Sequence, residues 1–175
     1  ILGSRGCPST CTFCGSPFGK NVRVRKTENI LQEIELLQKD YDIGTIRFID
    51  EMLLGGSRKH ISDFCEKVLC RRMNFSWSGE ILPNKVDFEL LKLMKRASCL
   101  YLVVGLESAS PRILKEIKKP NNLEHFKKVV QWCSELDLTL SINIISGTFS
   151  ETPETLAETK SYLLSLNQYK WLNTN

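Results

Sequence analysis

Short apolar segments alternate along the chain with longer segments in which apolar residues recur every three or four positions. The short segments predict strands, and the four clearest are Thr45–Asp50, Phe75–Gly79, Leu100–Leu106 and Thr139–Ser146. Two weaker candidates lie at the ends of the chain, at Ile1–Ser4 and Tyr169–Asn173. The segment Leu100–Leu106 is apolar without alternation, which is typical of a strand buried on both faces of a parallel sheet.

The longer segments predict helices that each bury one face. Their apolar positions are Ile30, Ile34 and Leu37, then Ile61, Cys65, Val68 and Leu69, then Leu90, Leu91 and Met94, then Phe126, Val129, Val130 and Cys133, and last Leu156, Leu163 and Leu166. Three helix starts carry a capping signal: Asp87, Ser110 before a proline, and Thr152 before a proline. The regular alternation of strand and helix predicts an α/β fold with five or six units.

This alternation fits both an open doubly wound sheet and a partial barrel, and periodicity does not choose between them. In either architecture ligands bind at the carboxyl ends of the strands. We therefore expect functional residues after Ser4 and at Asp50–Glu51, Gly79–Glu80, Gly105–Ser108 and Ser146–Gly147.

Composition narrows the class of protein further. The 175 residues are 42% hydrophobic and 25% charged, which excludes a disordered tail, a collagen-like repeat and a coiled coil and favours one domain. No apolar run approaches the length of a membrane span. The net charge of +4 is too small to indicate a nucleic-acid partner. Because the chain starts at Ile1 with a cysteine cluster soon after, we expect residues 1–175 to be one domain of a longer protein.

Seven cysteines are distributed unevenly, with three within eight residues at Cys7, Cys11 and Cys14. The other four are scattered through apolar or helical segments, where reduced cysteine behaves as a small hydrophobic residue, at Cys65, Cys70, Cys99 and Cys133. An odd number in this arrangement does not resemble a disulfide framework, so we expect a reducing compartment, the cytoplasm.

The triplet CxxxCxxC provides three thiolates on one loop, which is the ligand type that iron–sulfur centres select. Zinc is the first alternative, but a closed zinc site needs a fourth ligand, and the two histidines, His60 and His125, are each unpaired on a helix. Three ligands on a four-iron cluster leave one iron for another molecule. An iron–sulfur electron carrier or a metal-stabilised binding module remains the non-enzymatic alternative.

The triplet with its aromatic Phe13 resembles the motif of the radical S-adenosylmethionine (SAM) enzymes. Further segments resemble the cobalamin-binding subgroup in their order, namely Ser4–Pro8, Arg25–Ile30 with Glu33-Ile34, Phe48–Glu51, Gly105–Ser108, and Gly147 with Glu151-Thr152. The resemblance implies a partial (βα)6 TIM-like barrel with outer helices. It also implies that SAM binds the open iron of a [4Fe–4S] cluster and is cleaved by one electron to a 5′-deoxyadenosyl radical.

The resemblance also assigns roles to residues. Cys7, Cys11 and Cys14 match the cluster ligands, and Phe13 matches an aromatic residue beside the adenine. Asp50 and Glu51 match the segment that meets the methionyl amino group, largely through its backbone. Glu107 and Ser108 match contacts to the ribose or methionine, and Ile144 and Ile145 match an apolar wall beside the adenine.

The reaction that follows radical formation is left open by the sequence. Methyl transfer or another C–H functionalisation is the first expectation, with cobalamin held by a domain outside these residues and a flavodoxin or ferredoxin as reductant. A methylthiotransferase acting on tRNA or protein is the alternative enzyme. The chain departs from the subgroup in the turn Gly147–Thr152, which lacks a proline and a glycine, and at Leu82, where an arginine is usual. These departures leave the substrate and the catalytic residues unassigned.

Overall fold

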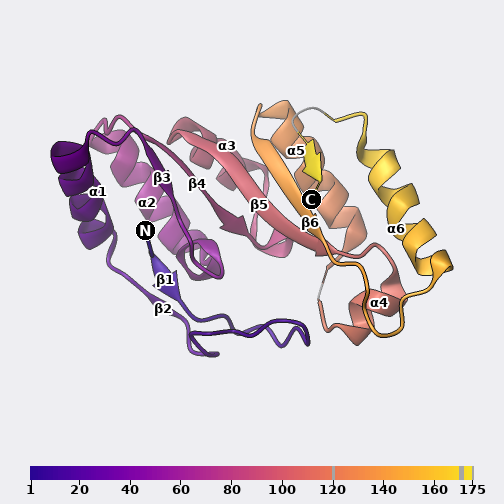
Figure 1. Ribbon diagram of the computed structural model, residues 1–175. Coiled ribbons are helices and arrows are strands. Elements are labelled where there is room, and N and C mark those ends of the chain that lie inside the picture. The colour runs from indigo at the N-terminus through magenta and orange to yellow at the C-terminus, as the bar shows by residue number, and fades with distance from the viewer. Residues whose placement is uncertain (120, 170–171, 175) are drawn as a thin grey trace.

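The computed structural model describes residues 1–119, 121–169 and 172–174. Its central element is a parallel five-stranded sheet in the order β3-β4-β5-β6-β7 (Figure 1). The strands are β3 (Thr45–Arg47), β4 (Ser76–Ile81), β5 (Cys99–Glu107), β6 (Thr139–Ile144) and β7 (Leu172–Thr174). The parallel sheet and the α/β class are therefore confirmed. The strand ends differ from the prediction by a few residues, and residues 170 and 171 of the last predicted strand lie outside the described chain.

The first residues of the chain lie along the free edge of β3. The amino group of Ile1 donates to the Arg47 carbonyl at 2.8 Å, and the Ile49 amide donates to the Ile1 carbonyl at 3.0 Å. The chain then turns away, and β1 (Ser4–Arg5) pairs antiparallel with β2 (Arg23–Val24). Of the expected first strand at Ile1–Ser4, only Ile1 forms backbone hydrogen bonds with β3 and the residues directly after it, while Gly3 and Ser4 bond to the Asp50 side chain. The two-residue pairs of β1 and β2 are too short to produce a periodic signal.

Helices follow the strands and cover the sheet in Figure 1. They are α1 (Thr27–Tyr41), α2 (Arg58–Cys70), α3 (Phe88–Arg96), α4 (Pro111–Glu116), α5 (Leu123–Glu135) and α6 (Pro153–Leu166), with short 3-10 helices η1 (Leu53–Gly56) and η2 (Pro83–Lys85). Asp87 caps α3 by accepting from the Leu90 amide at 2.9 Å, and Thr152 forms a capping box at α6. Ser110 precedes α4 as expected, but its side chain makes no capping hydrogen bond.

The hydrophobic core lies between the sheet and its helices and contains nearly all the predicted apolar faces. Its centre is a cluster of Phe48, Phe64 and Trp77, whose rings meet edge to face with centroids 5.3–6.0 Å apart. Trp77 also donates its indole N–H to the Ala97 carbonyl at 2.7 Å, so its one polar group is satisfied. Trp77 is therefore a packing residue of the core.

Helix α6 differs from its predicted packing. Leu156 is 44% exposed, and both Leu156 and Leu163 line a groove of about 700 Å³ between α6 and the end of β6. Leu166 alone among the predicted apolar positions of α6 is buried. The helix is therefore amphipathic as expected, and Leu163 and Leu166 pack against the core, but Leu156 at its beginning borders the groove and does not.

The arrangement of the elements positions the candidate site. Figure 1 shows the loop between β1 and β2, which contains the cysteine triplet, running below the carboxyl ends of β4 and β5. This is the edge at which a parallel sheet binds ligands. No helix in the described part of the chain has the length and apolarity needed to cross a membrane.

Candidate metal and cofactor site

The cysteine loop is held at three points by backbone hydrogen bonds. The Cys7 amide donates to the Gly19 carbonyl at 3.1 Å, and the Cys14 amide donates to the Cys11 carbonyl at 3.3 Å. In the middle of the loop, the Thr12 amide donates to the Ile117 carbonyl at 3.0 Å. The last contact joins the loop to the end of α4, so the triplet is anchored to the part of the chain that follows β5.

Gly6 fixes the turn that leads into Cys7. Its φ is +93°, in the left-handed region that favours glycine. A Cβ atom at this position would also overlap the Asn21 backbone carbonyl. Because backbone cannot move as a flexible side chain can, the chain requires glycine immediately before the first cysteine.

Two predicted acidic residues hold this loop with their side chains. Glu51 accepts from the Gly6 amide at 2.7 Å, directly before the first cysteine. Asp50 is buried and accepts from the Gly3 amide and the Ser4 hydroxyl, both at 2.7 Å. Both carboxylates thus stabilise the path of the chain into the cysteine loop.

The three thiols lie close enough to affect one another electrostatically. Cys7 and Cys11 are half-buried and Cys14 is exposed. Burial raises the pKa of the Cys11 thiol, the Lys119 ammonium opposes this shift, and the neighbouring Cys14 and Cys7 add to the increase. Among the described residues, no group of three or more His, Cys, Asp or Glu side chains could hold a metal ion. A four-iron cluster does not need such convergence, because each cysteine binds a different iron.

The remaining cysteines are not placed to join the triplet. Three of them, Cys65, Cys99 and Cys133, are buried in the core. Cys70 is exposed at the end of α2, just before β4 begins, and so lies at the opposite edge of the sheet from the strand carboxyl ends. The chain therefore offers three cysteine ligands at this edge and no fourth.

A buried ion pair stands at the end of β5. The Lys119 ammonium lies 2.8 Å from Glu107 Oε1, and the two side chains are only 10% and 8% exposed. Asn121 donates from Nδ2 to the Gly105 and Leu106 carbonyls, both at 3.0 Å, which holds the Lys119 segment against the strand. Glu107 is thus engaged by this chain's own lysine.

Glu80 at the end of β4 lies near this ion pair. Burial raises the pKa of the Glu80 carboxyl, with Glu107 adding to the increase and Lys119 opposing it. Glu80 also lines a small cavity of about 240 Å³ together with Asp50 and Asn143. Two carboxylates and one ammonium therefore lie together at the carboxyl ends of adjacent strands.

A second cavity joins the cysteine loop to this charged group. Its volume is about 350 Å³, and its walls include Cys11 from the loop, Met52 before η1, Gly55 within η1, and Lys119 and Asn121 after α4. The cavity is lined by both polar and apolar side chains, which is the usual character of a cofactor site.

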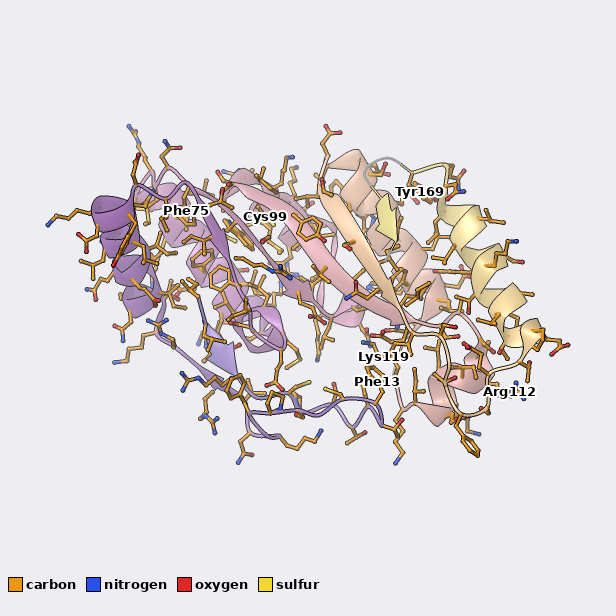
Figure 2. All side chains as sticks on the ribbon, viewed as in Figure 1. Phe13, Phe75, Cys99, Arg112, Lys119 and Tyr169 are labelled. Atoms are coloured by element: carbon orange, nitrogen blue, oxygen red, sulfur yellow. The ribbon has the colours of Figure 1, made fainter. Side chains whose placement is uncertain are left out.

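The other residues predicted to contact SAM do not all lie beside the cysteine loop. Phe13 is 44% exposed, and Figure 2 draws it in the same region of the view as Lys119. Ser108 is buried, and its hydroxyl lies 3.1 Å from the Thr159 hydroxyl of α6. Ile144 and Ile145 line the groove against α6 described above. The structure thus brings together the triplet, Asp50–Glu51 and Glu107, while Ser108, Ile144 and Ile145 face α6.

Two residues of the site were missed by the sequence analysis. Lys119 stands in a run of lysines after α4, which reads as a solvated surface, and Asn121 has no motif around it. Only the path of the chain after α4 brings them to β5.

The radical SAM superfamily model matches residues 1–163 of the 175. The chain belongs to the radical SAM superfamily. Among its relatives, the anaerobic magnesium-protoporphyrin IX monomethyl ester cyclase of Rubrivivax gelatinosus is 31% identical over 159 residues, which is 89% of this chain and 28% of that protein. The uncharacterized methyltransferase PH0819 of Pyrococcus horikoshii is 30% identical over 169 residues, covering 95% of this chain and 37% of that protein.

A solved radical SAM methyltransferase has the same fold. TsrM from Kitasatospora setae, with cobalamin and a [4Fe–4S] cluster bound, superimposes with a TM-score of 0.87 at 20% identity, covering all of this chain and 33% of that one. The open parallel sheet is therefore a partial TIM-like barrel. The chain spans about a quarter to two fifths of the length of these relatives.

Family membership makes a [4Fe–4S] cluster and SAM the cofactors of this chain. The donor set fits them, because three cysteine thiols on one anchored loop, without a fourth cysteine at that edge, suit a cluster with one open iron. The predictions that the chain is a radical SAM enzyme domain and that its cofactors are a [4Fe–4S] cluster and SAM are therefore confirmed.

Proposed function

We propose that Cys7, Cys11 and Cys14 each bind one iron of the [4Fe–4S] cluster and leave the fourth iron to SAM. When bound, the reduced cluster supplies the electron that splits SAM into methionine and a 5′-deoxyadenosyl radical. The observation that carries this assignment is the single anchored loop with three thiols in electrostatic reach of one another. The other cysteines are in the core or at the opposite edge of the sheet.

The protein's own residues position this chemistry. Glu51 and Gly6 hold the first cysteine, and the hydrogen bond from Thr12 to Ile117 holds the middle of the loop beside the cavity. These ties keep the three thiols at the carboxyl edge of the sheet before any cofactor binds, which reduces the entropy that must be lost on binding.

For SAM we propose two kinds of contact. The direct contacts are the ring of Phe13, which is 44% exposed, the backbone of Asp50–Glu51, and the carboxylate of Glu107, whose partner Lys119 lines the cavity next to Cys11. Ser108 is proposed to act indirectly, since its hydroxyl contacts Thr159.

Ile144 and Ile145 are proposed as the apolar wall beside the adenine. They stand at the end of β6, where the exposed fraction of Ile144 is 37%. Both also line the groove toward α6, so an adenine that contacts them must approach from the strand ends.

The reaction we propose is methyl transfer or another functionalisation of a carbon–hydrogen bond. It is supported by relatives described as a methyltransferase and as a cyclase. Cobalamin, which is bound in the TsrM structure, would have to be held by residues beyond those described for this chain. The methylthiotransferase and the electron carrier are less well supported, since the identified relatives with the higher identities are of other kinds.

A small electron-transfer protein such as a flavodoxin or ferredoxin is the proposed reductant. No disulfide joins any of the seven cysteines, all of which the structure describes, and Cys65, Cys99 and Cys133 lie reduced in the core. Free thiols persist in a reducing environment, so we propose the cytoplasm as the compartment.

The assignment is tested by anaerobic reconstitution of the protein with iron and sulfide, followed by reduction with dithionite and addition of SAM. Wild-type protein should release 5′-deoxyadenosine, and Cys7→Ala, Cys11→Ala or Cys14→Ala should each abolish it and lower the iron content. Cys70→Ala is the matched control, because this exposed cysteine lies at the other edge of the sheet. Release of 5′-deoxyadenosine by a triplet variant, or its loss in Cys70→Ala, would contradict the assignment.

A further inference from the structure

The Lys119–Glu107 ion pair differs from every other ion pair in the described part of the chain. The other pairs have side chains that are 33% to 53% exposed, whereas these two are 10% and 8% exposed. A buried ion pair is weak evidence for stability, because the cost of removing both charges from water can exceed their attraction. We therefore looked for a function of the Lys119–Glu107 pair other than stabilising the fold.

The chain makes space for this pair. A Cβ atom on Gly105 would overlap Glu107 Oε1 and would lie 2.7 Å from Lys119 Nζ. The two hydrogen bonds from Asn121 to the Gly105 and Leu106 carbonyls fix the segment that carries the lysine. Glycine on one side and asparagine on the other thus set the position of the ammonium.

The ammonium is placed beside the cysteine loop. Lys119 and Cys11 line the same cavity of about 350 Å³, and the hydrogen bond from Thr12 to Ile117 holds the two segments together. The nearby charged groups on the neighbouring strands are the carboxyls of Glu107 and Glu80 and the guanidinium of Arg47, and Lys85 lines the same cavity as Lys119.

We propose that Lys119, oriented by Glu107, sets the reduction potential of the cluster by placing one positive charge beside Cys11. The inference rests on the proposed ligation of the cluster by the triplet. Reduction adds one electron to a centre that is held by three thiolates, so a cation nearby stabilises the reduced form and raises the potential. Glu107 has the opposite direct effect, and it also determines where the cation stands. Hydrogen bonds, net charge and burial around a cluster are known determinants of its potential.

The two residues therefore predict shifts of opposite sign. Lys119→Met removes the positive charge and should lower the reduction potential. Glu107→Gln removes the negative charge, keeps a side chain of the same shape, and should raise the potential. A purely structural role for the pair would shift both variants in the same direction or reduce the cluster content of both.

The experiment is a redox titration of the reconstituted protein, followed by the electron paramagnetic resonance signal of the reduced cluster. Lys119→Arg keeps the charge and should keep the potential near that of the wild type. Lys115→Met is the matched control, since this exposed lysine on α4 is screened by solvent and should leave the potential unchanged. Iron and sulfide are measured in each variant.

Opposite shifts in Lys119→Met and Glu107→Gln, with an unchanged control, support the inference. Shifts of the same sign, no shift in either variant, or failure of both Lys119→Met and Lys119→Arg to assemble a cluster would overturn it. A wild-type protein that assembles no cluster would instead contradict the proposed function, so the two failures are distinguishable.

Discussion

Gly105 leaves the space that the Lys119–Glu107 pair fills, so a methyl group added there should displace the pair. A Cβ atom at this position overlaps Glu107 Oε1, lies 2.7 Å from Lys119 Nζ and lies 3.0 Å from Glu107 Cδ. At least one of the two charged side chains must therefore move in Gly105→Ala. Because both are buried, the available direction is the cavity beside Cys11.

The expected loss of stability in Gly105→Ala can be estimated from two known kinds of substitution. Adding a methyl group to a well-packed site costs about 1–3 kcal/mol, whereas stranding one charge of a buried pair costs about 3–5 kcal/mol. The displaced side chains can enter a partly polar cavity, so neither charge is stranded and the lower range applies. For a domain of this size, about 1–3 kcal/mol corresponds to a melting temperature lower by about 2–12 °C.

The assay is thermal unfolding of Gly105→Ala under anaerobic conditions, with two controls. Gly44→Ala should be neutral, because no heavy atom lies within 4 Å of a Cβ atom placed on Gly44. In a protein that already carries Glu107→Ala and Lys119→Ala, the Gly105→Ala change should have little further effect, since the overlapping atoms are gone.

Two results would refute this reasoning. One is a melting temperature of Gly105→Ala equal to that of the wild type. The other is an equal loss in the background without the two charged side chains, which would show that the cost arises from the backbone and not from the ion pair.

Three further predictions concern other parts of the chain. Burial raises the pKa of Cys65 and Cys133 to about 12, so iodoacetamide should label exposed Cys70 in the folded protein while these two react only after unfolding, as mass spectrometry would show. Burial also raises the pKa of Glu80 above its unfolded value, so ionisation of this carboxyl destabilises the native state once pH exceeds that value. Glu80→Gln should therefore raise the melting temperature at neutral pH, and the gain should vanish as pH falls below about 4.3. Thr152→Ala removes the capping box of α6 and should cost about 0.5–2 kcal/mol in chemical denaturation.

The overall fold follows from local patterns in the sequence. The apolar segment that became β5 is continuous enough to predict a buried parallel strand. The segments that became β4 and β6 are short and lack the helical period of the segments on either side. Asp87 and Thr152 also cap their helices as their positions predict, because capping depends on residues within one helical turn. The pair β1–β2 was missed, since two residues per strand carry no period.

The site is only partly predictable. Three cysteines within eight residues are visible in the sequence, because the ligands of the loop are close together in the chain. The hydrogen bond from Gly6 to Glu51 joins positions 45 residues apart, and Lys119 reaches Glu107 only after the chain has passed through α4. No local pattern contains such contacts.

A polar residue at the end of an apolar strand can either bind a ligand or bond to the protein itself, and the sequence looks the same in both cases. Ser108 ends an apolar strand next to Glu107, and the sequence suggests a ligand contact for both. The structure places the Ser108 hydroxyl against Thr159 and the Glu107 carboxylate against Lys119. A polar residue at a strand end can satisfy its side chain within the protein, and only the positions of its neighbours show which partner it has.

The open iron of the cluster is the central claim, and Mössbauer spectroscopy of protein reconstituted with iron-57 tests it directly. If Cys7, Cys11 and Cys14 are the protein ligands, one iron of the four should change its spectrum when SAM is added while the other three keep theirs. A spectrum that SAM leaves unchanged, or one in which all four irons already show thiolate ligation, would contradict the account.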